Sequence, residues 1–159
     1  MEIRLANKQD IPGMIALLKQ VGQVHHQIRP DLFRAGAQKY NEAALEALLQ
    51  DPSRPIFVAA ADSVLGYCFC ILEEVTEDPV LRDVKNLYID DLCVDEGCRG
   101  RGIASALYAH VCEYARAIGC RGITLNVWCG NDNAMAFYQK MGMKPRKIYM
   151  EASLEETGC

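Results

Sequence analysis

The sequence predicts an α/β protein with a mixed β-sheet, and three observations support this. Consecutive β-rich segments between residues 55 and 94 have no helix between them, which favours antiparallel hairpins. A helical repeat over residues 103–118 joins the segment 84–94 to the segment 121–129, which favours a parallel pair with a right-handed crossover. The 159 residues are 50% hydrophobic and 24% charged, enough for one core. We therefore expect a single domain over residues 1–159.

The N-terminal third predicts one strand and two helices. Residues 2–6 are expected to form the first strand, and Asp10 to cap a helix that tolerates Pro12 in its first turn. Apolar residues then recur at helical spacing up to Val21. A second helix is expected over residues 41–50, because Asp51-Pro52 ends it.

The remainder alternates strands with helices. Residues 55–61 and 64–75 are expected to form a hairpin, an acidic loop follows at 76–83, and residues 84–94 form the next strand. A helix is expected over residues 103–118, because its apolar face ends before Gly119, and a strand over residues 121–129. A short helix over residues 132–141 ends before Gly142, and residues 143–154 are expected to form one or two final strands.

Composition narrows the class of function. A formal net charge of −4 gives no support to nucleic-acid binding. We see no signal peptide and no apolar run long enough to cross a bilayer, so we expect a cytoplasmic protein with no membrane partner. The eight cysteines form no C-x-x-C pair and are irregularly spaced. We therefore expect reduced thiols and no metal site.

A glycine-rich turn follows the strand 84–94 and precedes a helix. Its glycines permit positive φ and a close approach of backbone to ligand, and the first N–H groups of a helix attract anions. Arg99 and Arg101 add positive charge. A P-loop is excluded because Ile103-Ala104 stands in place of Lys-Ser/Thr. A dinucleotide site would need a third glycine at Ser105 and an acid in the next strand. An ordinary corner with surface arginines remains an alternative.

Three segments together resemble the GNAT family of N-acetyltransferases. Residues 99–104 resemble its Q/R-x-x-G-x-G/A motif at every fixed position. Residues 131–143 resemble its N-x-x-A-x-x-F-Y-x-x-x-G-F box, with Met143 in place of the aromatic. Residues 87–94 are similar to its fourth strand. The three occur in the family's order and spacing.

This resemblance implies a GNAT fold, with a mixed, centrally splayed sheet flanked by about four helices. It also implies that acetyl-CoA, as co-substrate, lies in the cleft between the fourth and fifth strands. The residues implied in binding it are Leu92, Cys93 and Val94 for the pantetheine arm, Arg99, Gly100, Arg101, Gly102, Ile103 and Ala104 for the pyrophosphate, and Asn131, Ala134 and Tyr138 near the thioester.

The chemistry of amine acetylation assigns further roles. The amine must first lose a proton, since a lysine-like pKa is about 10.4, and Asp90 or Asp91 could accept it directly or through water. The backbone N–H of Leu92 or Cys93 could stabilise the oxyanion, and Tyr138 could protonate the leaving thiolate. Asp90 leads as the base, although either acid could instead face water or bond to the chain.

The acceptor is expected to be a small cationic primary amine, attracted by the acids on this strand and the preceding hairpin. In spermidine/spermine acetyltransferases, whose fourth strand looks similar, Glu stands at the position of Asp90. Alternatives are a protein N-terminal or lysine acetyltransferase, or a non-catalytic acetyl-CoA sensor. The resemblance places His25, His26 and Arg29 where the family builds its acceptor pocket, and a surface loop is the alternative for these residues. Trp128 is expected to serve packing more than recognition. The resemblance also implies a homodimer.

Overall fold

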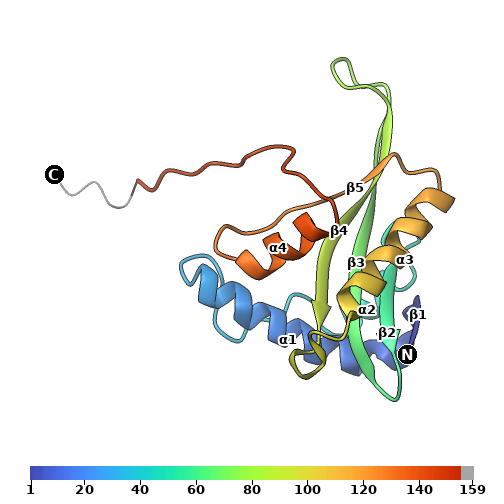
Figure 1. Cartoon of the computed structure of the whole chain (residues 1–159), viewed down its shortest axis with the longest axis vertical. Coiled ribbons are helices and arrows are strands. Elements are labelled where there is room, and N and C mark those ends of the chain that lie inside the picture. The colour runs from blue at the N-terminus through green and yellow to red at the C-terminus, as the bar shows by residue number, and fades with distance from the viewer. Residues whose placement is uncertain (155–159) are drawn as a thin grey trace.

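The computed structural model describes residues 1–154 and contains one five-stranded sheet with helices on both faces (Figure 1). The strands lie side by side in chain order. Their bounds are β1 Glu2–Leu5, β2 Ile56–Ala60, β3 Val64–Val75, β4 Val84–Val94 and β5 Gly122–Leu125. The α-helices of this part of the chain are α1 Ile11–Ile28, α2 Glu42–Leu48, α3 Ile103–Ala117 and α4 Asp132–Lys140.

The predicted mixed sheet is confirmed. β1 to β4 pair antiparallel, whereas β5 runs parallel to β4, with Asn86 opposite Gly122 and Ile89 opposite Leu125. Alternate residues of the strands therefore face two separate cores. One core joins α1 and α2 to the face that carries Tyr67 and Phe69. The other joins α3 to the opposite face, so helices cover both faces of the sheet.

Helix α1 is longer than predicted, because it continues past Gly22 to Ile28. A Cβ on Gly22 would lie 2.5 Å from the backbone oxygen of Ala37. This glycine thus serves close packing of the following loop instead of ending the helix. The extra turns bring His25 toward the sheet. None of the helices within residues 1–154 is long and apolar enough to span a membrane.

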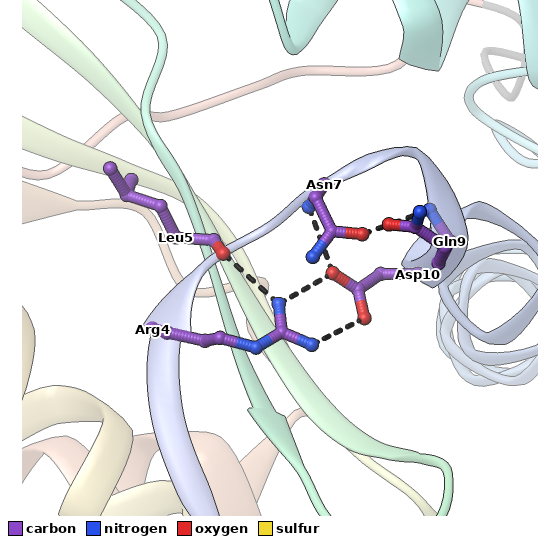
Figure 2. Close-up of polar contacts among 5 residues, drawn as sticks. All are labelled: Arg4, Leu5, Asn7, Gln9 and Asp10. Carbon is purple, nitrogen blue, oxygen red and sulfur yellow. Dashed lines mark hydrogen bonds and ion pairs between the residues drawn. The ribbon is translucent and has the colours of Figure 1, made fainter.

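The start of α1 differs in detail from the prediction. Asp10 occupies the N-cap position of α1, as predicted, but its side chain makes no capping hydrogen bond to that helix. It accepts instead from the backbone N–H of Asn7, whose own side chain accepts from the N–H of Gln9 in the 3-10 turn Lys8–Asp10. Asp10 also accepts two hydrogen bonds from the guanidinium of Arg4 (Figure 2). Nη1 of Arg4 lies 2.7 Å from Oδ2 of Asp10, and Nη2 lies 2.9 Å from Oδ1. This buried carboxylate ties β1 to the beginning of α1, and the Arg4 hydrogen bonds keep its pKa below the ordinary value.

The prediction of one or two strands over residues 143–154 was wrong. This segment forms no strand and leaves the body of the protein after α4 (Figure 1). β5 is also shorter than the predicted 121–129, because its pairing with β4 stops at Leu125. Among the described residues, β5 is thus one edge strand of the sheet, and β1 is the other.

Candidate functional site

The cleft begins where β4 and β5 separate. Their last paired residues are Ile89 and Leu125, and the β3–β4 register shifts at the same level, with Asp90 as the extra residue. Beyond this bulge, Leu92, Cys93 and Val94 pair only with β3. No strand pairs with their backbone on the β5 side, and an unpaired strand edge is the structure to which extended ligands bind by strand addition.

The separation of the strands leaves a cleft of about 80 Å³. Its walls come from α1, from β4, from β5 and the residues 126–128 that follow it, and from α4 with its N-cap Asn131. The lining residues are Val21, His25, Ile89, Asp91, Leu92, Leu125, Asn126, Val127, Trp128, Asn131, Ala134 and Tyr138. Three predicted segments, on β4, at residues 131–138 and at His25, thus meet in one place.

The glycine turn lies at the beginning of α3. Gly100 and Gly102 have φ of 77° and 78°, which L side chains rarely adopt, and no atom lies within 4 Å of a Cβ at either position. Gly102 gives α3 no side-chain cap. The first N–H groups of the helix therefore face an open, exposed turn next to Arg99 and Arg101, as an anion site requires.

Helix α4 brings Asn131, Ala134 and Tyr138 to the cleft. The side chain of Asn131 accepts from the N–H of Ala134 and so fixes the start of the helix. Burial raises the pKa of Tyr138 well above that of free tyrosine. At neutral pH this residue keeps its proton. Its neighbour Phe137 packs against Tyr108 with ring centroids 6.4 Å apart, outside the cleft lining.

The two acids of β4 occupy different environments. Asp90 is held by Lys39, with Nζ 2.7 Å from Oδ2, and by the hydroxyl of Tyr40 at 3.2 Å. Its charge is therefore already compensated by a lysine of the loop between α1 and α2. Asp90 does not line the cleft among the described residues, whereas Asp91 does.

Asp91 is the partly buried carboxylate of the cleft. The hydroxyl of Tyr67 donates to its Oδ2 at 2.8 Å. Burial is the largest effect on this carboxyl and raises its pKa from 3.8 to about 6, against the lowering effects of the Tyr67 hydrogen bond and of Lys39. A carboxylate with this pKa is mostly ionised at neutral pH and is a stronger base than an exposed aspartate.

Two aromatic rings of the cleft lining, those of His25 and Trp128, both contact Phe33. The rings of His25 and Phe33 are tilted, with centroids 5.0 Å apart, and Phe33 and Trp128 meet edge to face at 5.2 Å. Trp128 thus packs, as predicted, and also lines the cleft while 40% exposed. Burial and the nearby charge of Lys39 lower the pKa of His25, so its imidazole is neutral at pH 7.

The other two residues of the predicted acceptor region do not line the cleft. His26 hydrogen-bonds through Nδ1 to the backbone oxygen of Phe33 at 2.7 Å and so fixes the loop after α1. Arg29 pairs with Asp31 and with Glu151, both at 2.6 Å.

Sequence reasoning missed Tyr67, Lys39 and Tyr40. Tyr67 lies opposite Cys93 on β3, two positions from Phe69, which pairs with Asp91. Strand alternation and the antiparallel register could have placed it beside this acid. No local pattern marked Lys39 and Tyr40, because their approach to Asp90 depends on the path of an irregular loop.

Comparisons with known proteins show similarity to acetyltransferases. The model of the Acetyltransferase (GNAT) family matches residues 22–143. A glucosamine 6-phosphate N-acetyltransferase of Trypanosoma brucei brucei is 31% identical over 67 residues, which cover 42% of this chain and 44% of that protein. The peptidyl-lysine N-acetyltransferase YjaB of Salmonella typhimurium is 28% identical over 144 residues, which cover 89% of this chain and 82% of YjaB.

Among solved structures, a mutant of the BH1408 protein from Bacillus halodurans has a TM-score of 0.92 at 33% identity. The match covers 97% of this chain and 99% of that one. The chain therefore spans less than half of the trypanosomal relative, but most of YjaB and nearly all of the BH1408 chain.

Proposed function

This chain belongs to the GNAT family of acetyltransferases, and we propose that it moves the acetyl group of acetyl-CoA to a primary amine. Membership of this family makes the chain an acyltransferase. The observation that carries it is the cleft in which Asp91 and Tyr138 meet, where β5 no longer pairs with β4. The uncapped glycine turn follows this strand in the chain.

The donor would lie along the open edge of β4. The backbone of Leu92 to Val94 would pair with the amide-bearing pantetheine arm, and the N–H groups after Gly102 would receive the pyrophosphate. Arg99 and Arg101 would add charge at the same end. Asn131 and Ala134 line the cleft and would lie near the thioester.

The proposed transfer divides the proton chemistry between two residues. Asp91 accepts the proton that the amine must lose, and Tyr67 holds this carboxylate in position. A backbone N–H of Leu92 or Cys93 stabilises the oxyanion that forms at the acetyl carbonyl. Tyr138 then gives its proton to the leaving thiolate, for which a hydroxyl of raised pKa is suited.

The geometry favours Asp91 over Asp90 as the base. Asp91 lines the cleft and has a pKa near 6, whereas Asp90 is bound to Lys39 and Tyr40. Asp90 then serves acceptor binding: the ammonium of Lys39 occupies a cation position beside the cleft. A small cationic amine would displace Lys39 from this carboxylate. A lysine side chain of a protein is the second candidate acceptor, supported by the similarity to YjaB.

A panel of amines tests the proposal. Polyamines, aminoglycosides, amino acids and lysine peptides would each be mixed with acetyl-CoA, and both CoA release and product mass would be measured. We expect an acetylated amine together with stoichiometric CoA. Release of CoA without any acetylated acceptor, or no turnover with the whole panel, would contradict the proposal.

The role of Lys39 can be tested with the acceptor found. Lys39→Gln removes the internal cation, so KM for a cationic amine should fall while kcat changes little. Lys8→Gln is the matched control, because Lys8 pairs with Glu46 on the exposed surface. A rise in KM in Lys39→Gln would show instead that Lys39 binds an anionic part of the acceptor.

A further inference from the structure

The backbone at Lys39 is anchored to the sheet by the residue that follows it. The ring of Tyr40 stacks on Phe69 of β3, with centroids 5.6 Å apart, and its hydroxyl donates to Oδ2 of Asp90 at 3.2 Å. On the other side of Lys39, the side chain of Gln38 donates to the backbone oxygen of Tyr40. The loop between α1 and α2 is thus fixed at this point, whereas the side chain of Lys39 is 44% exposed.

The amine of Lys39 lies close to two walls of the cleft. Its Nζ is 2.7 Å from Oδ2 of Asp90, the residue before Asp91 in β4. Burial has the largest effect on the pKa of Asp91 and on that of His25, and the charge of Lys39 lowers both. Because such an effect weakens with distance, Lys39 lies within electrostatic range of the walls that β4 and α1 contribute.

The side chain of Lys39 is suited to exchange one carboxylate for the other. A lysine carries its charge on a flexible four-carbon stem, and its three donors rotate freely. In the pair with Asp90 the amine keeps its proton: burial lowers the pKa of Lys39, but Asp90 raises it by more. To become a nucleophile, the amine has to move to a base that lines the cleft, and the neighbouring Asp91 is the proposed base.

We propose that Lys39 is itself an acceptor, acetylated at Nζ within its own chain by acetyl-CoA in the cleft, an inference that rests on the proposed function. Asp91 takes one proton from the ammonium, the freed Nζ bonds to the acetyl carbon, and the carbon–sulfur bond breaks. Tyr138 protonates the departing thiolate and regains a proton as Nζ loses its second one. The ammonium and acetyl-CoA thus give the amide, CoA and one proton, which leaves from Asp91.

Acetylation of Lys39 would change the acceptor side of the site. An acetylated lysine has no charge, so it no longer compensates Asp90. This carboxylate then receives a cationic acceptor without displacement of an internal ammonium. The first acetyl group transferred would therefore prepare the enzyme for later acceptors, and the KM for a cationic amine should fall to the value of Lys39→Gln.

Mass spectrometry of the full chain and of its peptides, after incubation with acetyl-CoA alone, tests the inference. Wild type should gain one acetyl group on Lys39, with a half-time that does not depend on protein concentration, because the amine belongs to the same chain. Lys39→Arg should not gain this group, and neither should folded Gly102→Glu, which should not bind the donor. Lys85→Arg is the matched control, since Lys85 also pairs with a carboxylate, that of Glu74, and it should react like wild type.

The amine panel separates failure of this inference from failure of the proposed function. Acetylation of an amine from the panel without acetylation of Lys39 would overturn the inference and leave the proposed function standing. Acetylation of neither would overturn both. Equal modification of Lys39 in wild type and Gly102→Glu would show direct reaction with free acetyl-CoA. A half-time that shortens with protein concentration would show transfer between copies, and either of these two results would overturn the inference.

Discussion

The hydroxyl of Tyr67 donates a hydrogen bond to Oδ2 of Asp91, and these two residues come from adjacent strands at the level of the β4 bulge. Tyr67 is fully buried against α1, so it fixes the orientation of a carboxylate that lines the cleft. The pair places a base of raised pKa where β4 and β5 separate.

Asp91→Asn should lower activity and raise stability. The carboxyl has a pKa of about 6 in the folded protein against an ordinary 3.8, so its ionisation opposes folding as pH rises through this range. At pH values above the folded pKa the neutral amide removes a cost of roughly 1–3 kcal/mol, while it can still accept from Tyr67. Thermal unfolding at alkaline and at acidic pH would measure this: the gain should vanish below the ordinary aspartate pKa. An equally large gain at acidic pH would contradict the assigned ionisation.

The pH profile of wild-type activity should show the ionisation of the Asp91 carboxyl. kcat/KM for the acceptor should rise through a pKa of about 6, because only the ionised Asp91 accepts the proton of the amine. In Asp91→Asn this step should be absent, whereas Asp90→Asn should keep it with an altered KM. If His25→Gln alone abolished the step, the neutral imidazole would be the base in its place.

Tyr138→Phe should lower kcat by ~10²–10⁴-fold, because the ring stays and the acidic proton is lost. CoA affinity should barely change. Tyr108→Phe is the control, since Tyr108 is the aromatic neighbour of Tyr138 and does not line the cleft. Wild-type turnover in Tyr138→Phe would show that solvent protonates the thiolate.

Asp10→Asn should destabilise the fold by roughly 1–3 kcal/mol, since a charge-assisted bond between β1 and the start of α1 is lost (Figure 2). The pKa of Asp10 is lower in the folded protein than in the unfolded chain. The stabilisation by its carboxylate is therefore complete above the ordinary aspartate pKa and is lost as pH falls through the lowered pKa of the folded state. The difference in unfolding free energy between wild type and variant should therefore shrink in acid. Glu46→Gln, which removes the exposed pair with Lys8, should leave stability unchanged.

Much of the fold follows from local patterns in the sequence. The bounds 64–75 and 84–94 match β3 and β4, because alternation and the flanking turn residues mark these strands on both sides. The glycine turn was also predictable from the sequence, since positive φ at Gly100 and Gly102 favours glycine. The end of α1 could not be predicted in this way, because Gly22 resembles a helix stop unless its close contact with Ala37 is known.

The acceptor side of the site was harder to predict. The expectation that Asp90 leads as the base did not include the bulge and Lys39, which change its surroundings. The prediction of strands over residues 143–154 was wrong for another reason. This segment has the composition of a strand, yet composition does not specify whether a sheet edge is available to it.

Titration of CoA by calorimetry into wild type and two glutamate variants tests the account most directly. Gly102 and Gly119 lie at opposite ends of α3, share a φ of 78°, and have no atom within 4 Å of an added Cβ. The two substitutions therefore impose similar backbone strain, but only Gly102→Glu adds bulk and negative charge at the proposed pyrophosphate site. We predict that wild type and Gly119→Glu bind CoA with similar affinity and that folded Gly102→Glu does not bind it. Equal affinity in all three proteins would contradict the assignment of this cleft to acetyl-CoA.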